Sequence, residues 1–322
     1  MDRLVFILVV TFGSAFLGYV TRRARFAPLS AVSRRAGEVS RLVKIAALFV
    51  LNPVPIVNSF WRLSLGSGTL IVYPLLGLLS VSVAGLSAVA LNSWFSIPPK
   101  RAASVFIAGM FTNIISLGGL TAFAFFGHDG YALVPLFNTF ISVAYYAVGF
   151  PVSHKLSLDG TSGLTVSPRA FRERPYLLVP LAAMALGLLL NVGGVAHPVL
   201  LDGVSGVLIP LVSGMISYSI GLTLYFGRIG AYRKEIVLVA LIKFMIVPAV
   251  MIPLGILAGL PHLPGGLPFR VLVILSVMPV AFNALVPPAI YGFDLDLANS
   301  AWVVTTLALI PILPLLYFFV GV

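Results

Sequence analysis

Long runs of apolar residues, separated by short polar segments, dominate this sequence. Most runs are long enough for an α-helix to cross the hydrocarbon core of a bilayer, which takes about 20 residues. The apolar residues are continuous and do not alternate with polar ones, so the pattern excludes a transmembrane β-barrel. The runs predict ten membrane helices, at about Leu4–Val20, Leu42–Phe60, Thr69–Leu91, Ala102–Phe126, Tyr131–Val152, Pro175–Val192, Gly206–Phe226, Ile236–Leu260, Val271–Tyr291 and Leu297–Phe319.

The fourth predicted helix carries helix-weakening and polar residues near its middle. Asn113 places an amide inside an apolar run, and the pair Gly118-Gly119 weakens the helix and exposes its backbone. Backbone groups freed inside a membrane need partners in the protein or in a water-lined cavity. We expect a break in this helix of the kind at which transporters bind substrate. A polar packing contact beside a small-residue surface is the simpler alternative.

The ninth predicted helix has the same character. It contains a second amide, Asn283, together with the helix-breaking Pro279, Pro287 and Pro288. When Gly127 is aligned with Gly292, the glycine pair of the fourth helix falls on Asn283-Ala284. Two interrupted helices in corresponding positions of two halves indicate a transport site.

Positively charged residues predict the orientation of the helices. Most of the 20 Lys and Arg residues fall in polar segments that follow every second helix, and such segments face the cytoplasm. These segments are Thr21–Arg41, Asn92–Arg101, Ser153–Arg174 and Arg228–Lys234. We therefore predict a multi-pass protein of the cell membrane with both termini outside the cytoplasm. The positive cluster follows the first apolar run instead of preceding it, which favours a retained helix over a cleaved signal peptide.

The predicted helices divide into two halves of five. Residues 1–152 form the first half, residues 153–174 a polar cytoplasmic linker, and residues 175–322 the second half. Because five is an odd number, the second half enters the membrane from the opposite side, which is the arrangement of inverted repeats. The predicted fold class is an all-α polytopic membrane protein with ten transmembrane helices.

Composition agrees with a membrane protein and excludes several functions. Hydrophobic residues make up 60% of the 322 and charged residues 9%, against roughly 45–50% and 25% in soluble domains. The net charge of +11 sits in short loops, so it does not indicate nucleic-acid binding. No cysteine is present and the four histidines lie in or beside loops, so we expect no metal site and no cofactor. The sequence has no H-E-x-x-H, no G-x-S-x-G and no paired carboxylates, which argues against an enzyme.

Ionisable residues inside the membrane point to an anionic substrate. None of the nine acidic residues falls in the middle of a predicted helix, which argues against a proton antiporter built on aspartates. Lys243 does fall there, at a cost of roughly 2.5–3.5 kcal/mol on insertion scales. A substrate anion or a permanent contact with backbone carbonyls at a helix break can offset that cost, and we favour the substrate. The driving ion, sodium or proton, is left open.

The remaining polar residues are weaker candidates. Asn52 in the second helix and Asn138 in the fifth can contact a ligand, but amides in membrane helices more often contribute packing hydrogen bonds. The candidate substrate-binding residues are Asn52, Asn113, Gly118, Gly119, Asn138, Lys243, Asn283 and Pro287.

Several of these motifs together resemble a known family. They are Asn113 with Gly118 and Phe126-Gly127, Met278-Pro279 through Asn283 to Tyr291-Gly292, Lys243-Phe244 with Pro248, and Asn52-Pro53. Over nearly its whole length the chain resembles the auxin efflux carrier family of permeases, relatives of the plant PIN-formed carriers. One departure is Leu120, where the family usually has proline.

The resemblance implies a fold and a mechanism. The fold is two inverted five-helix repeats, shared with bile acid:sodium symporters, in which helices 4 and 9 cross at their breaks. Helices 1, 2, 6 and 7 form a scaffold, and helices 3–5 and 8–10 move against it as an elevator-type transport domain. Family substrates are organic anions such as malonate, malate and indole acetate. The helix 4 asparagine, here Asn113, contacts the substrate carboxylate.

The resulting hypothesis is a secondary transporter of a small organic anion in a lipid bilayer. A sodium-coupled symporter of the bile acid type is the first alternative. A membrane sensor that binds a ligand without transport is the second, and the absence of a long soluble segment argues against it. The substrate, the direction of transport and the oligomeric state, including a homodimer, are left open by the sequence.

Overall fold

The computed structural model describes residues 2–23, 29–62, 72–157, 179–224 and 229–321. Within these ranges the chain is helical, and the β-structure consists of one isolated bridge. Six helices are long and apolar enough to cross a membrane, and a seventh is counted if two helices that meet at a 43° bend form one span. The predicted all-helical, multi-pass membrane protein is confirmed at this level. The number of ten spans and the inverted orientation of the halves stay predictions.

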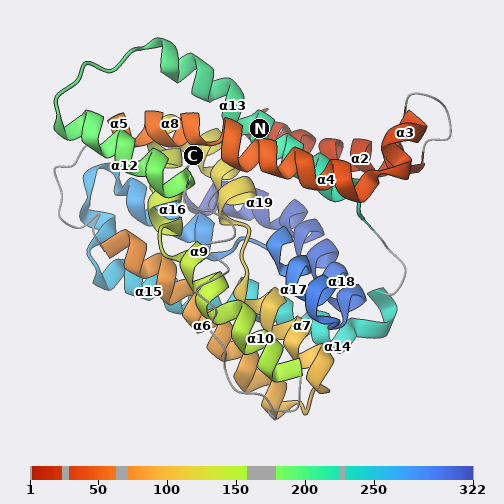
Figure 1. Ribbon diagram of the computed structural model, residues 1–322. Helices are drawn as coiled ribbons and strands as arrows, with labels where there is room; N and C mark the ends of the chain where they lie inside the picture. The colour runs from red at the N-terminus through yellow and green to blue at the C-terminus, as the bar shows by residue number, and fades with distance from the viewer. Residues whose placement is uncertain (1, 24–28, 63–71, 158–178, 225–228, 322) are drawn as a thin grey trace.

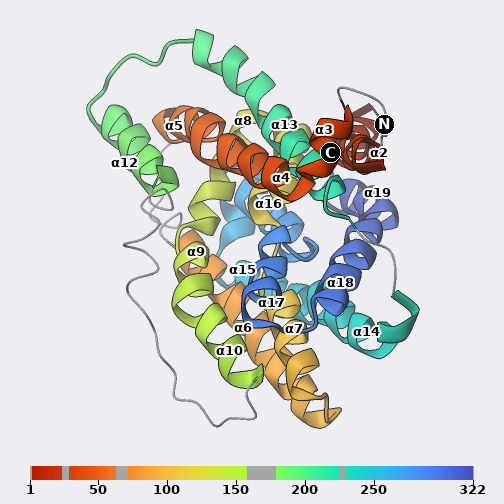
Figure 2. The same cartoon turned by 45° about the vertical axis from the view of Figure 1, so that its right-hand side comes forward.

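The helices are arranged in two layers (Figures 1 and 2). The layer drawn at the top, called the upper layer here, contains helices from the start of the chain and two from its middle. These are α1 (Asp2–Leu8), η1 (Val9–Gly13), α2 (Ser14–Arg23), α3 (Leu29–Arg34), α4 (Ala36–Ile45), η2 (Ala46–Leu51), α5 (Pro53–Arg62), α12 (Val179–Val192) and α13 (Leu200–Gly221). Helix α13 packs against α2, α4 and α5, and α12 packs against α5.

The lower layer contains the other helices. Its first part is α6 (Val72–Trp94), α7 (Pro99–Met110), η4 (Ile114–Gly118), α8 (Gly119–Asn138), α9 (Ile141–Ala144), η5 (Tyr145–Gly149) and α10 (Phe150–Ser157). Its second part is η7 (Ile229–Tyr232), α14 (Arg233–Leu241), η8 (Ile242–Ile246), α15 (Val247–Leu257), η9 (Leu260–His262), η10 (Pro264–Gly266), α16 (Leu267–Ser276), η11 (Phe282–Leu285), α17 (Val286–Tyr291), α18 (Leu295–Leu307) and α19 (Leu309–Phe319). Helices α8 and α19 adjoin the upper layer through α1.

The two chain ends lie near each other on the same side of the molecule in both views (Figures 1 and 2). Which side of the membrane they face stays a prediction. The predicted linker at 153–174 lies mostly outside the described residues. Its first residues, up to Ser157, continue helix α10.

A sharp turn at Gly127 separates the predicted fourth and fifth helices. Gly127 has φ +65° and ψ −151°, a conformation that is essentially restricted to glycine. The helices on its two sides, within the run Ile114–Ser157, therefore change direction at the short turn that the sequence predicted there.

The fourth helix breaks earlier than the glycine pair predicted. Helix α7 ends at Met110, the next three residues leave the helical conformation, and η4 begins at Ile114. Gly118 and Gly119 are both helical, with φ −60° and −62°. They serve close packing instead, because a Cβ atom on Gly118 would lie 2.7 Å from the side chain of Leu275. The glycine pair was thus the wrong position for the break.

The ninth helix breaks where its first proline stands. Helix α16 ends at Ser276, and Pro279 lies in the non-helical stretch before η11. Pro287 and Pro288 do not break a helix: they occupy the first turn of α17, where a missing N–H costs nothing.

Candidate functional site

The two broken helices cross at their breaks and hydrogen-bond to each other there. The Asn113 N–H donates to the Pro279 carbonyl, and the Ala281 N–H donates to the Phe111 carbonyl, both at 2.9 Å. The pattern is that of an antiparallel β-bridge. Main-chain groups freed by each break are therefore satisfied by the other break, which is what an apolar interior requires.

Two side chains satisfy further main-chain groups at the crossing. The Thr112 N–H donates to the Tyr145 hydroxyl at 2.8 Å, and the Val280 N–H donates to the Thr305 hydroxyl at 3.3 Å. The Tyr145 ring also stacks on Phe111, with ring centroids 3.8 Å apart. Helices η5 and α18 thereby fix the two extended stretches from either side.

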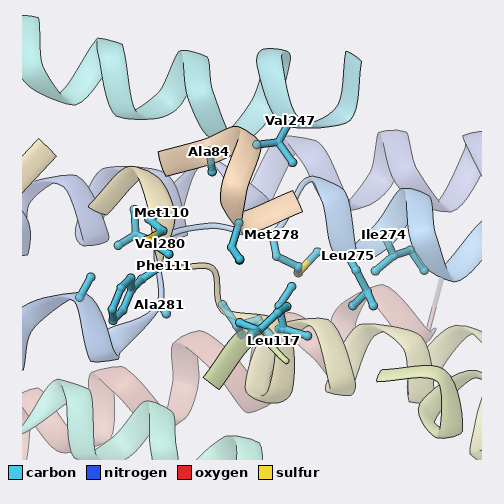
Figure 3. Close-up of a cluster of buried hydrophobic side chains, with 14 of the residues drawn as sticks. Ala84, Met110, Phe111, Leu117, Val247, Ile274, Leu275, Met278, Val280 and Ala281 are labelled. Carbon is cyan, nitrogen blue, oxygen red and sulfur yellow. The ribbon is translucent and has the colours of Figure 1, made fainter. Parts of the chain in front are cut away.

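Apolar side chains from both broken helices surround the crossing (Figure 3). They include Met110, Phe111 and Leu117 from one helix and Leu275, Met278 and Val280 from the other, all buried. This packing keeps water from the main-chain hydrogen bonds and holds the breaks at a fixed position.

Lys243 reaches the crossing from the eighth helix. It lies in the wide π-turn η8, just before Pro248, whose missing N–H leaves a carbonyl of the preceding turn without its usual partner. Its ammonium donates to the Phe111 carbonyl at 2.9 Å and to the Thr112 hydroxyl at 2.6 Å. Only 1% of the side chain is exposed. The contact with a backbone carbonyl at a helix break is one of the two arrangements that the sequence left open for Lys243.

Asn113 caps the second half of the broken fourth helix. Its side-chain Oδ1 accepts the Leu117 N–H at 3.4 Å, and the residue is 7% exposed. Because the amide oxygen serves as the cap, the amide NH₂ group is left as the donor, with no partner among the described residues. It stands at the positive end of the helix that starts here.

A cavity of about 410 Å³ adjoins this amide. Its lining comes from both layers: helices η1, α2 and α13 above, and the break with α18 below. The lining residues are Thr11, Phe12, Ala15, Phe16, Tyr19, Asn113, Leu117, Ser217, Ile220, Leu224, Trp302, Val303, Thr306 and Leu307. Among the described residues, no charged side chain lines it, so it is apolar with a few polar groups.

Three of the lining residues carry a buried polar atom without a hydrogen-bond partner in the described part of the chain. These atoms are Thr11 Oγ1, Trp302 Nε1 and Thr306 Oγ1. A buried polar atom left unpaired costs about 1–3 kcal/mol, so its presence in three residues around one cavity needs an explanation. Each of these atoms exposes less than 1 Å² of surface, so a ligand or water in the cavity would reach it only after a local rearrangement.

The structure brings Asn113 and Lys243 together at the crossing but leaves other candidate residues elsewhere. Asn283 is exposed in η11, outside the cavity lining. Asn52 accepts a 2.8 Å hydrogen bond from the Tyr131 hydroxyl.

Asn138 lines a separate, small cavity of about 50 Å³ and donates to Ser142 Oγ at 3.4 Å. Pro287 is buried in α17, and neither glycine of the pair Gly118-Gly119 lines the 410 Å³ cavity. None of these candidates therefore lines the cavity beside the Asn113 amide in the described conformation.

Other side chains at or near the crossing and the cavity carried no prediction from the sequence. Lys44 lies with its ammonium 3.2 Å from the centroid of the Phe282 ring and so connects α4 to η11. Thr112 and Trp302 gave no signal, because threonine and tryptophan are common in membrane helices. The described residues include no cluster of metal-binding side chains.

Comparison with known proteins identifies a relative described as a transporter. No family model matches the chain. The chain is 25% identical over 273 residues to a protein of Methanothermobacter thermautotrophicus described as an uncharacterized transporter, and the match covers 83% of this chain and 84% of that protein.

Proposed function

We propose that this protein is a secondary transporter that carries an organic anion across the membrane by alternating access. The apolar helices and the similarity to a protein described as an uncharacterized transporter support a membrane transporter. The anion is supported by one observation above all: the Asn113 amide, a hydrogen-bond donor at the positive end of a half-helix, lines a cavity between the two layers.

The chemistry of the cavity favours a negatively charged group over a positive one. The N-terminus of a half-helix carries a partial positive charge, and transporters with broken helices direct such ends at carboxylates. The described lining contains no carboxylate that could bind a cation. An amide NH₂ and a helix end are sufficient partners for one carboxylate.

The size and lining of the cavity favour a substrate with an apolar body. A volume of about 410 Å³ is within the range for small-molecule sites, and aromatic and aliphatic side chains such as Phe12, Phe16 and Leu117 make up most of its lining. A compact dicarboxylate would leave its second charge without a partner there. We therefore expect monocarboxylates with an apolar body to bind more tightly than short dicarboxylates.

The location of the cavity favours transport over simple binding. Its lining is shared by the upper layer, through Thr11 and Ser217, and by the lower layer, through Asn113 and Trp302. A shift of one layer against the other would carry a ligand at the crossing from one side of the membrane to the other, which is alternating access.

Uptake into proteoliposomes, together with ligand-induced thermal stabilisation of the purified protein, tests this function. A panel of aliphatic and aromatic monocarboxylates and short dicarboxylates should identify at least one transported anion. Asn113→Ala should weaken its binding about 10-fold, roughly the loss of one hydrogen bond to a charged group. Asn113→Asp should weaken it further through repulsion between like charges.

Asn283→Ala is the matched control, because it removes an exposed amide from the other broken helix and should leave binding within about 2-fold. If Asn113→Asp binds and transports the anion as well as the parent protein does, the proposed substrate class is wrong. A gain in binding of an organic cation by that variant would point to a cationic substrate instead.

A further inference from the structure

We infer that Arg22 and Arg23 form an entry site, which captures the carboxylate of the substrate before that group reaches Asn113. The inference rests on the proposed function, because it concerns how the same anion enters the same cavity. Its carrying observation is that two exposed guanidinium groups each contact a residue of the cavity lining. Arg22 Nη1 donates to the Leu224 carbonyl at 2.8 Å, and Arg23 Cζ lies 4.5 Å from the centroid of the Tyr19 ring.

The two arginines continue the helix face that lines the cavity. Thr11, Ala15 and Tyr19 follow one another at intervals of four residues along η1 and α2, and all three line the cavity. Residues three and four positions further along a helix lie on the same face, and after Tyr19 these are Arg22 and Arg23. The entry site therefore stands one turn beyond the cavity lining, at the end of α2.

The cavity reaches the surface beside this end of α2. Two of its lining residues, Phe16 from the upper layer and Leu307 from the lower, are 67% and 46% exposed. A third, Leu224, lies beyond the end of α13 at Gly221. An anion can therefore meet the arginines on its way into the cavity.

Both guanidinium groups keep hydrogen-bond donors for a carboxylate. The bond to the Leu224 carbonyl uses one of the five N–H donors of Arg22, and the ring contact of Arg23 uses the face of its guanidinium group. The described residues form ion pairs through Arg62, Arg101 and His197, and neither Arg22 nor Arg23 takes part in one. Arginines at a helix end also set orientation and complement the helix dipole, but those roles require no contact with a cavity.

The entry site provides the positive charge that the cavity lining lacks. Exposed charges beside a low-dielectric cleft concentrate the field there and raise the local concentration of an oppositely charged ligand. Charges at the rim of a binding site mainly raise the association rate, whereas buried partners mainly slow dissociation. Arg22 and Arg23 should therefore set how fast the anion binds, and Asn113 how long it stays.

Stopped-flow fluorescence of the purified full chain separates these two rates. Replacing Trp61 and Trp94 by Phe leaves Trp302, which lines the cavity, as the single tryptophan of this parent protein. At about 0.01 M ionic strength, Arg22→Gln combined with Arg23→Gln should bind the transported anion about 10-fold more slowly, with dissociation changed less than about 2-fold. At about 1 M, where screening acts within about 3 Å, parent and variant should bind at the same rate.

Arg233→Gln combined with Lys234→Gln is the matched control, since it removes the same charge from an exposed helix end. The Lys234 ammonium likewise donates to a main-chain carbonyl, that of Phe95 at 3.1 Å, and lies 5.1 Å from the Phe95 ring. Neither control residue lines the cavity, so this variant should bind like the parent. Arg22→Lys combined with Arg23→Lys keeps both charges and should retain most of the association rate and its dependence on salt.

An anionic lipid offers the same chemistry, a negative group on an apolar body, and nanodiscs distinguish the two sources. The parent should bind the transported anion with the same salt dependence in phosphatidylcholine nanodiscs as in detergent. If added phosphatidylglycerol stabilises the parent but not the double glutamine variant, while both bind the anion at one rate, the arginines hold a lipid headgroup and the inference is wrong.

Three further results would overturn the inference. The first is a parent whose association rate is the same at low and high ionic strength, which decides the matter even if the double glutamine variant does not fold. The second is a double glutamine variant that binds as fast as the parent at low ionic strength. The third is a control pair that slows binding equally. A parent that binds no organic anion instead overturns the proposed function, and the inference with it.

Discussion

At the scale of single residues, Tyr145 shows how the crossing depends on side chains outside the two broken helices. Its hydroxyl accepts the Thr112 N–H, a group that the break leaves without a helical partner. The hydroxyl is buried, so no water can replace it. A small polar group on the fifth helix therefore decides whether an extended stretch of the fourth is stable.

Tyr145→Phe should destabilise the protein by about 1–3 kcal/mol, because it leaves a buried N–H group unsatisfied while keeping the ring that stacks on Phe111. Thermal or denaturant unfolding in detergent measures this loss. Tyr317→Phe is the control: Tyr317 contacts Phe125 with its ring, and its hydroxyl forms no hydrogen bond with the described residues. Equal stability of the two variants would show that the Thr112 N–H finds another partner.

The sequence identified Asn113 and Lys243 because a polar side chain inside a long apolar run is conspicuous. It could not show which way such a side chain faces. Asn283 also lies inside its apolar run, yet the residue is exposed on the short 3₁₀-helix η11 and does not line the cavity. Trp302 and Thr306 line the cavity one helical turn apart on α18, and nothing local distinguishes them from residues that pack against neighbouring helices.

At the scale of elements, the position of a break depends on its partner more than on local helix propensity. The glycine pair is the weakest point of the fourth helix by propensity, yet it remains helical. The break lies instead at the three residues Phe111–Asn113, which exchange main-chain hydrogen bonds with the ninth helix. The bonded partners are 166 (279 − 113) and 170 (281 − 111) residues apart in sequence, so only the three-dimensional arrangement reveals them.

Helices α2 and α13 approach each other closely at two glycines. A Cβ atom on Gly18 would collide with the Tyr218 carbonyl oxygen, and one on Gly221 would collide with the Ala15 carbonyl oxygen. Contacts between helix backbones at small residues are typical of tight association in membranes. These contacts make the upper layer a firmly packed unit.

Gly221→Ala should destabilise the protein by about 1–3 kcal/mol, the usual range for overpacking, because the main chain of α2 has to move. Gly203→Ala on the same helix is the matched control, since its Cβ would meet no atom within 4 Å. The control should be neutral, or more stable by up to about 1 kcal/mol through helix propensity. Unfolding temperatures of the two variants measure the difference, and similar values would show that α2 and α13 separate easily.

At the scale of the whole molecule, the two layers contact each other through few ionic groups. On one edge, Arg62 of α5 pairs with Asp202 of α13 at 2.7 Å within the upper layer, and lies 4.0 Å from Asp129 of α8 in the lower layer. The same arginine thus has one partner in its own layer and one across the boundary. Movement of the layers would separate the second pair and leave the first intact.

Cross-linking at this edge tests the movement, and the chain has no cysteine of its own to interfere. Cysteines in place of Arg62 and Asp129, joined by a short reducible cross-linker, should abolish most uptake, and reduction should restore it. Cysteines in place of Arg62 and Asp202, joined in the same way, should leave uptake close to that of the untreated variant. Full uptake by the first pair after complete cross-linking would contradict movement between the layers.

Composition and the length of the apolar runs were sufficient to predict an all-helical membrane protein, because both follow directly from the solvent that surrounds it. Composition and run length do not show which helices belong to the upper layer and which to the lower layer. Helix α12 is as apolar as helices of the lower layer, yet it packs against α5, and that choice depends on the shapes of both surfaces. Residues 158–174 of the predicted linker at 153–174 lie outside the described residues, so the connection between the predicted halves stays a prediction.

The two main-chain hydrogen bonds at the crossing have a mechanical consequence. Each one joins the non-helical stretch of the fourth helix to that of the ninth, so a displacement of one stretch moves the other with it. We therefore expect the broken regions of the fourth and ninth helices to move together during transport.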